Sequence, residues 1–141
     1  MYLVDTNIWL ERLLDQERSV EVGEFLSVIH SDQMGITDFS LHSIGVITAR
    51  LKRPEIFTTF LSDACIEGAV NIISLVPEHL QKLVHSMALY HLEFDDAYQF
   101  TAANEYGLIL VSFDTDFDRT SIQRRTPKQV LDTMQERSGV I

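Results

Sequence analysis

Cysteine, proline and basic side chains are scarce in this chain. Cys65 is the only cysteine among 141 residues, so an internal disulfide is impossible and a reducing cytoplasm is the expected location. No apolar run approaches the ~20 residues of a membrane-spanning helix. The N-terminus also lacks a basic segment followed by an apolar one. We therefore expect neither a secretory signal nor a membrane anchor.

Lysine and arginine total 11 against 21 aspartate and glutamate residues, which gives a formal net charge of −10. Proteins that coat nucleic acids usually present a basic surface, because phosphate contacts dominate their affinity. The acidic balance argues against such a coat and favours a metal-filled site or a basic protein partner. Apolar residues make up 45% of the chain, enough for the core of one domain spanning residues 1–141.

Short apolar segments alternate with helical patterns along the chain. This alternation predicts a three-layer α/β/α sandwich around a central, mostly parallel sheet of four to five strands. Strands are expected at 2–5, 35–37, 70–75 and 108–111. Helices are expected at 7–14, from Ser19, at 40–51, from Pro54, from Pro77, from Asp95 or Asp96 to Gly107, and from Thr126 with Pro127 in the first turn.

Acidic residues stand at the ends of these segments. Asp5 follows the first strand, Asp114 and Asp116 follow the last, and Asp96 stands at a helix start. Because ligands of parallel sheets bind beyond the carboxyl ends of the strands, these carboxylates are expected to share one pocket. Crowded carboxylates repel one another unless a cation lies among them. Hard ions such as Mg²⁺ or Mn²⁺ prefer oxygen ligands, so the pattern favours a metal-dependent phosphodiesterase.

Each acidic segment also has a simpler interpretation. Asp5 suits the N-cap of the following helix, and so does one of Asp95 and Asp96. The segment 114–116 suits a turn, in which aspartate is common. What favours the shared pocket is that all three acidic segments occur at these positions in one alternating chain.

Two other acidic sites are disfavoured by the sequence. A calcium-binding loop starting at Asp114 would need glycine and glutamate where Arg119 and Arg125 stand. A phosphatase built around 114–116 would usually carry its nucleophilic aspartate at the first strand, with a second acid nearby. Asp5 is followed by threonine and asparagine instead, so we give this analogy little weight.

Three segments together resemble the PIN-domain family, in particular its VapC-type toxin ribonucleases. They are LVDTN at 3–7, DDAYQFTAANEYGLILVSFDTDF at 95–117 and TPKQVL at 126–131. The resemblance covers essentially the full chain, and the order and spacing of the segments carry it. It implies a small α/β domain that hydrolyses RNA at a magnesium or manganese site. It also implies a homodimer and a cognate antitoxin protein that blocks the acidic pocket.

Transferred position by position, the resemblance assigns Asp5, Asp96 and Asp114 as metal ligands. Asp116 joins them as a catalytic residue that positions water or a second ion. The implied mechanism is metal-assisted hydrolysis of a phosphodiester. Residues with a supporting role, which orient the acids or lie near them, are Thr6, Asn7, Ser43 and Ser112.

The helix after the second strand departs from the family's pattern. Its usual glutamate is replaced by Ser43, and no glutamate lies between Asp32 and Glu55. Three substitutes stay open: Ser43 through a water molecule, His42 through a nitrogen that suits zinc or manganese better than magnesium, or Asp38. The alternative function is a catalytically degenerate PIN domain that binds a protein or RNA without cleaving it.

Overall fold

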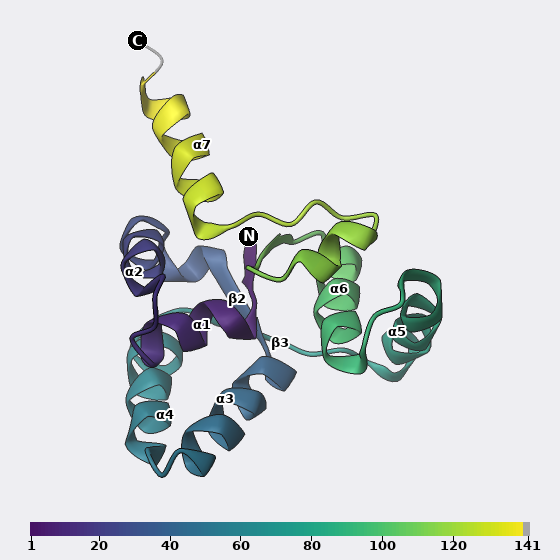
Figure 1. The fold of residues 1–141 in the computed structure, drawn as a ribbon, viewed down its shortest axis with the longest axis horizontal. Coiled ribbons are helices and arrows are strands. Elements are labelled where there is room, and N and C mark those ends of the chain that lie inside the picture. The colour runs from purple at the N-terminus through teal and green to yellow at the C-terminus, as the bar shows by residue number, and fades with distance from the viewer. Residues whose placement is uncertain (140–141) are drawn as a thin grey trace.

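The computed structural model describes residues 1–139 and contains a four-stranded, fully parallel sheet (Figure 1). The strand order is β3-β2-β1-β4, so the first strand of the chain lies in the interior of the sheet. Arg125 adds a single-residue parallel bridge to Val111 at the outer edge of β4. The strands are β1 (Tyr2–Val4), β2 (Met34–Thr37), β3 (Asn71–Ile73) and β4 (Ile109–Val111).

Seven α-helices of the described chain connect and cover these strands, which confirms the predicted α/β sandwich. No helix among residues 1–139 combines the length and apolar character needed to cross a bilayer. The expected domain of residues 1–141 includes two residues, 140 and 141, that lie outside the described range. The helices are α1 (Thr6–Leu13), α2 (Ser19–Val28), α3 (Asp38–Arg50), α4 (Pro54–Phe60), α5 (Pro77–Tyr90), α6 (Phe94–Tyr106) and α7 (Pro127–Gly139).

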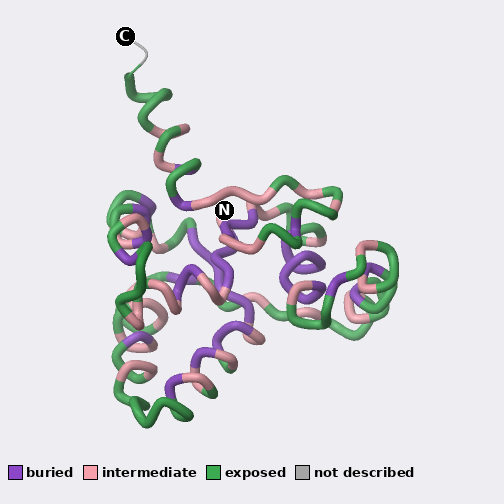
Figure 2. Tube along the Cα trace, viewed as in Figure 1, coloured by how far each residue is buried: buried purple, intermediate pink, exposed green. Residues whose placement is uncertain are grey.

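Successive strand residues face opposite sides of the sheet, which divides the core in two. Leu3 and Leu110 pack with residues of α5 and α6 on one side. Val4 and Val111 pack with residues of α1, α2 and α7 on the other. All four side chains are at most 1% exposed, and Figure 2 shows the central strands buried between helices whose outer surfaces are exposed. The sheet is thus fixed from both faces.

Two helix starts differ from those expected. Arg18 rather than Ser19 is the N-cap of α2, and Glu93 is the N-cap of α6. Asp95 and Asp96 therefore lie in the first turn of α6 and neither caps it; the Oδ1 atom of Asp95 accepts a hydrogen bond from the Asp96 N–H. Carboxylates in the first turn still gain from the free N–H groups and the helix dipole, which explains why the sequence resembles a cap.

Other boundaries follow their expected local signals more closely. The strand expected at 70–75 shortens to β3, because its partner β2 ends at Thr37, opposite Ile73. At α7, Thr126 and Gln129 exchange hydrogen bonds: the Gln129 N–H donates to Thr126 Oγ1 at 3.2 Å, and the Thr126 N–H donates to Gln129 Oε1 at 2.9 Å. This reciprocal cap confirms the helix start predicted there.

Candidate metal centre

The carboxyl ends of β1 and β4 meet the first turn of α6 at one pocket of about 300 Å³. Asp5 directly follows β1, Asp96 belongs to α6, and Asp114 lies in the turn after β4. All three line the pocket, together with Asp95 of α6 and Ser43 of α3. The structure therefore brings acids from distant parts of the chain together at the end of the sheet where ligands of parallel folds bind.

Asp5 forms the floor of this pocket and is only 6% exposed. Its Oδ1 atom accepts hydrogen bonds from the Thr6 N–H and from the Gln99 side-chain amide, both at 2.8 Å, and its Oδ2 accepts from the Ser112 hydroxyl at 2.7 Å. Burial raises the pKa of Asp5 and the nearby Asp114 raises it further, while the three hydrogen bonds lower it. Asp5 is also the N-cap of α1, so the capping interpretation and the pocket position are both correct.

A buried polar network lies behind Asp5 and joins four elements. The amide of Gln99 donates to Ser40 Oγ at 2.9 Å, and its Oε1 accepts from the Thr37 hydroxyl at 2.7 Å. The Thr6 hydroxyl donates to Ser40 Oγ at 2.7 Å. Sequence reasoning missed this network. Its one signal was Gln99, a long polar side chain within the stretch of α6 that is otherwise rich in small and apolar residues.

Asn7 and Ser112 connect the floor to the turn after β4. The Ser112 hydroxyl donates to Asp5 and accepts from the Asp114 N–H at 3.0 Å and from Asn7 Nδ2 at 3.3 Å. Asn7 Oδ1 in turn accepts from the Phe113 N–H at 3.3 Å. Both side chains are engaged in holding the acids in place, and such contacts orient metal-binding carboxylates in many proteins.

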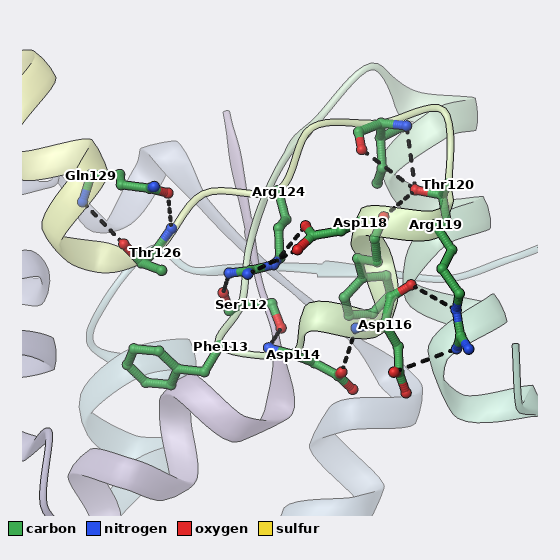
Figure 3. Close-up of polar contacts among 12 residues, drawn as sticks. Ser112, Phe113, Asp114, Asp116, Asp118, Arg119, Thr120, Arg124, Thr126 and Gln129 are labelled. Carbon is green, nitrogen blue, oxygen red and sulfur yellow. Dashed lines mark hydrogen bonds and ion pairs between the residues drawn. The ribbon is translucent and has the colours of Figure 1, made fainter.

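The mouth of the pocket carries a tight group of three carboxylates. Asp96, Asp114 and Asp116 each have an oxygen within 4.8 Å of the others. Figure 3 shows Asp114 and Asp116 on the turn after β4, where Asp114 Oδ1 accepts the Asp116 N–H at 2.8 Å. Burial, the largest cause, and repulsion from Asp95, Asp114, Asp5 and Asp116 together raise the pKa of Asp96 to about 7. The charged form of Asp96 is thus poorly stabilised by the surrounding protein.

The chemistry of this group suits a hard divalent cation. It offers only oxygen ligands, it is partly open to solvent, and a cation would relieve the repulsion that burdens Asp96. The ligand set expected from the sequence was Asp5, Asp96 and Asp114. In the structure the tight group contains Asp116 in the place of Asp5, whose oxygens already accept three hydrogen bonds.

The three possible substitutes for the absent glutamate occupy different places. Ser43 lines the acidic pocket, whereas His42 lines the adjoining groove along α3. Asp38 is not among the pocket residues, and its Oδ1 accepts from the Tyr98 hydroxyl at 2.6 Å and from the Phe39 N–H at 2.8 Å. Ser43 is therefore the one of the three that faces the acids.

Arg124 fastens the loop that carries Asp114 and Asp116, as Figure 3 shows. Its Nε and Nη2 atoms donate to the two carboxylate oxygens of Asp118 at 3.0 and 3.2 Å, and Nη1 donates to the Ser112 carbonyl at 3.2 Å. The guanidinium thus links both ends of the turn. At its far edge, Arg119 lies 3.5 Å from an oxygen of Asp116.

A larger hollow of about 590 Å³ lies elsewhere, between α1, α2 and α4. Its lining is dominated by apolar side chains such as Trp9, Leu26 and Phe60, and it includes none of the acids described above. Size alone would favour this hollow as a ligand site, but it lacks a cluster of reactive groups. We therefore assign the chemistry to the smaller acidic pocket.

The fold and site define an α/β domain with carboxylates gathered at the ends of parallel strands. The sequence profile of the PIN domain matches residues 2–123, and the chain belongs to that family. The predicted family is thus confirmed. By sequence, no curated protein matches the chain.

Solved structures similar to this chain include a toxin–antitoxin complex and a toxin. A toxin–antitoxin complex from Klebsiella pneumoniae is 24% identical, with a TM-score of 0.70, covering 90% of this chain and 98% of that chain. FitAcB of Neisseria gonorrhoeae is 20% identical, with a TM-score of 0.75 and coverage of 91% and 99%. The sarcin-ricin loop cleaving toxin VapC20 of Mycobacterium tuberculosis is 14% identical, with a TM-score of 0.77 and coverage of 90% and 100%. At these identities the likeness shows a shared fold.

Proposed function

We propose that this protein is a metal-dependent endoribonuclease that hydrolyses RNA phosphodiester bonds with Mg²⁺ or Mn²⁺. The observation that carries the proposal is the group of three carboxylates, Asp96, Asp114 and Asp116, within 4.8 Å of one another. Membership of the PIN family and the similarity in fold to a toxin described as cleaving the sarcin-ricin loop support an RNA substrate.

The side chains of the pocket would have different roles in the reaction. Asp96, Asp114 and Asp116 would hold the cation, and Asp5 would fix the inner boundary of the site through its hydrogen bonds. Such an ion, when bound, lowers the pKa of water and offsets negative charge in the transition state. Asp96 would give up its proton as the cation enters, because its pKa lies near 7. The polar network behind Asp5 would keep this geometry rigid.

The biological setting we propose is a cytoplasmic toxin of a toxin–antitoxin pair. Solved structures with the same fold include a toxin–antitoxin complex and FitAB bound to a DNA fragment. A cognate antitoxin could block the site by placing an arginine among the acids of the pocket, since guanidinium pairs strongly with carboxylates. We also propose that the active species is a homodimer.

Cleavage of a single-stranded RNA by the purified protein with Mn²⁺ tests the activity. Asp114→Asn should lower the rate by about 10³-fold or more, because removal of one ligand weakens several kcal/mol of charge stabilisation. The asparagine oxygen can still accept the Asp116 N–H, so the turn should fold. Asp132→Asn on α7 makes the same change in net charge outside the pocket and should leave the rate unchanged. Equal cleavage by all three proteins would reveal a contaminating nuclease and refute the proposal.

A degenerate PIN domain is the second candidate, and the position of Ser43 favours it. A neutral hydroxyl lines the pocket where the family usually has a glutamate. A calorimetric titration with Mn²⁺ distinguishes the enzyme from the degenerate domain. Binding in the micromolar to low millimolar range supports the enzyme, whereas no binding at millimolar Mn²⁺ supports a module that binds a partner without cutting.

A further inference from the structure

A groove of about 400 Å³ runs along α3 and lies next to the acidic pocket. Its lining residues recur every three or four positions and so form one face of the helix. Phe39, Ser43 and Ile47 line both the groove and the pocket, so the two hollows are neighbours that share a wall. The remaining residues of the groove are His42, Val46 and Arg50.

Ser43 stands at the junction between groove and pocket. Its side chain is short and uncharged, whereas a glutamate at this position would add a negative charge. With serine at this position, the lining shared by the two hollows contains no carboxylate. A polymer bound in the groove would therefore meet none of the acids that line the pocket.

The inner end of the groove has an aromatic wall. Phe39 stacks on Tyr98, with ring centroids 5.3 Å apart at an angle of 28°, and Phe94 lies 6.0 Å from Phe39. Tyr98 is itself held, because its hydroxyl donates to Asp38 at 2.6 Å and accepts from the Leu75 N–H at 3.2 Å. Phe94 is 45% exposed although it directly precedes the acidic turn of α6. Phe39, the aromatic residue that lines both hollows, is thus backed by two further rings.

The outer end of the groove carries a cation, Arg50, whereas His42 lies near the inner end, one helical turn from Phe39. Arg50 and His42 are exposed, and neither side chain makes an ion pair or hydrogen bond with any residue in 1–139. By contrast, the neighbouring Arg53 is paired with Glu55 at 2.8 Å. The rise of the helix separates Ser43 from Arg50 by about 10 Å, so the charge changes sign over a short distance.

We propose that this groove binds the single-stranded RNA segment next to the scissile phosphate. One base stacks on Phe39, and a phosphate beyond it lies against Arg50. This assignment rests on the proposed function for the position of the scissile phosphate. The combination of an aromatic face and a cation is what single strands recognise without sequence preference, and each stacked base contributes about 1–3 kcal/mol. A purely apolar occupant would leave Arg50 and His42 without a partner.

Binding of a short RNA that carries 2-aminopurine tests the groove separately from catalysis. The full chain is titrated with the RNA in Ca²⁺, and a gel verifies that the RNA stays intact. Phe39→Leu should weaken binding about tenfold and abolish the fluorescence quenching that stacking causes. Arg50→Gln should weaken binding by a smaller factor and lower the slope of log affinity against log salt by about 1.

Matched controls distinguish the groove from a general surface effect. Arg53→Gln removes the same charge, and Tyr106→Leu removes another exposed aromatic ring; both should bind RNA like the native protein. Phe39→Tyr should keep the quenching, and thermal unfolding verifies that Phe39→Leu is folded.

The outcomes separate this inference from the nuclease proposal. Unchanged RNA binding by Phe39→Leu and Arg50→Gln would overturn the inference, even if the protein cleaves RNA. Weakened binding by both, in a protein that never cuts, would support the groove and refute only the nuclease. Sedimentation of the same variants tests self-association. A loss of dimer with unaltered RNA binding would show that α3 contacts a second copy of the chain, and would also overturn the inference.

Discussion

Aspartate side chains at the floor and at the mouth of the acidic pocket lie in contrasting environments. At the floor, Asp5 accepts three hydrogen bonds from groups whose positions are fixed by α1, α6 and the end of β4. At the mouth, Asp96 accepts no hydrogen bond and makes no ion pair within residues 1–139. Its carboxylate is instead surrounded by four other acids.

This difference identifies which acids belong to the fold and which are available for a ligand. The buried carboxylate is matched to donors, as buried charges must be. At the mouth, Asp96 and Asp114 are half-buried and Asp116 is exposed. Repulsion from the neighbouring acids helps to raise the pKa of Asp96, and a cation would relieve it. This contrast supports our proposal that Asp5 shapes the site and that Asp96, Asp114 and Asp116 hold the ion.

Substitutions at the floor and at the mouth of the pocket should affect the free energy of unfolding differently. Gln99→Met removes the amide that links Asp5, Ser40 and Thr37, and should lower the free energy of unfolding by about 2–3 kcal/mol because buried polar groups lose their partners. Asp96→Asn removes one of several repelling charges, and should leave the free energy of unfolding unchanged or raise it at pH 8. Chemical denaturation without metal measures both. A large loss in Asp96→Asn would contradict the division into floor and mouth.

A carboxylate placed at position 43 should strengthen metal binding at the mouth of the pocket. We expect Ser43→Glu to bind Mn²⁺ about tenfold more tightly, because another oxygen ligand adds charge beside the acidic group. Without metal the same variant should be less stable, since the new charge joins an already repelling cluster. Ser27→Glu on the exposed side of α2 is the control of equal charge. Calorimetric titration decides, and an affinity equal to that of the control would show that position 43 does not reach the ion.

The pKa of Asp96 makes the stability of the metal-free protein depend on pH. This pKa is raised to about 7 in the folded state, above about 3.9 for an unfolded aspartate. The folded protein therefore binds the proton more tightly. The stabilisation that this group provides is fully present below pH 4 and is lost as the pH rises through 7. Compared with Asp96→Asn, the native chain should lose stability between pH 4 and 7 and then level off.

Saturating Mn²⁺ tests the origin of this loss, because a bound cation competes with the proton on Asp96. Denaturation series at several pH values, with and without the ion, provide the measurement. Parallel curves for the native chain and Asp96→Asn at all pH values would show that Asp96 titrates normally.

Much of the fold followed from local patterns, and the pocket followed from topology. The run Leu108–Val111 and the alternation of strands with helices were sufficient to predict a parallel sheet. Once the sheet is parallel, Asp5 and Asp114 must lie at the same edge. Helix starts were less predictable, because Asp95 and Asp96 gain from the first turn of α6 whether or not they cap it.

Thr6 and Ser112 were named from the sequence, but Gln99 and the network behind Asp5 could not be predicted in the same way. Gln99, Ser40 and Thr37 contact Asp5 or one another across the sheet from three elements. No periodicity in one segment encodes such a contact. The exchange of Asp5 for Asp116 in the tight group has a similar origin, because it depends on the short turn that points Asp116 back toward Asp96.

The smallest effect expected concerns the loop that supports the mouth. Arg124 is only 15% exposed and grips both carboxylate oxygens of Asp118 and the Ser112 carbonyl, so Arg124→Gln should cost about 1 kcal/mol of stability. Because the same loop positions Asp114 and Asp116, Mn²⁺ affinity should fall a few-fold as well. Arg53→Gln, which breaks a fully solvated pair with Glu55, should change neither quantity. If Arg124→Gln lost stability but kept its full Mn²⁺ affinity, the acids would be positioned by Ser112 and Asn7 alone, and the loop would be only a structural element.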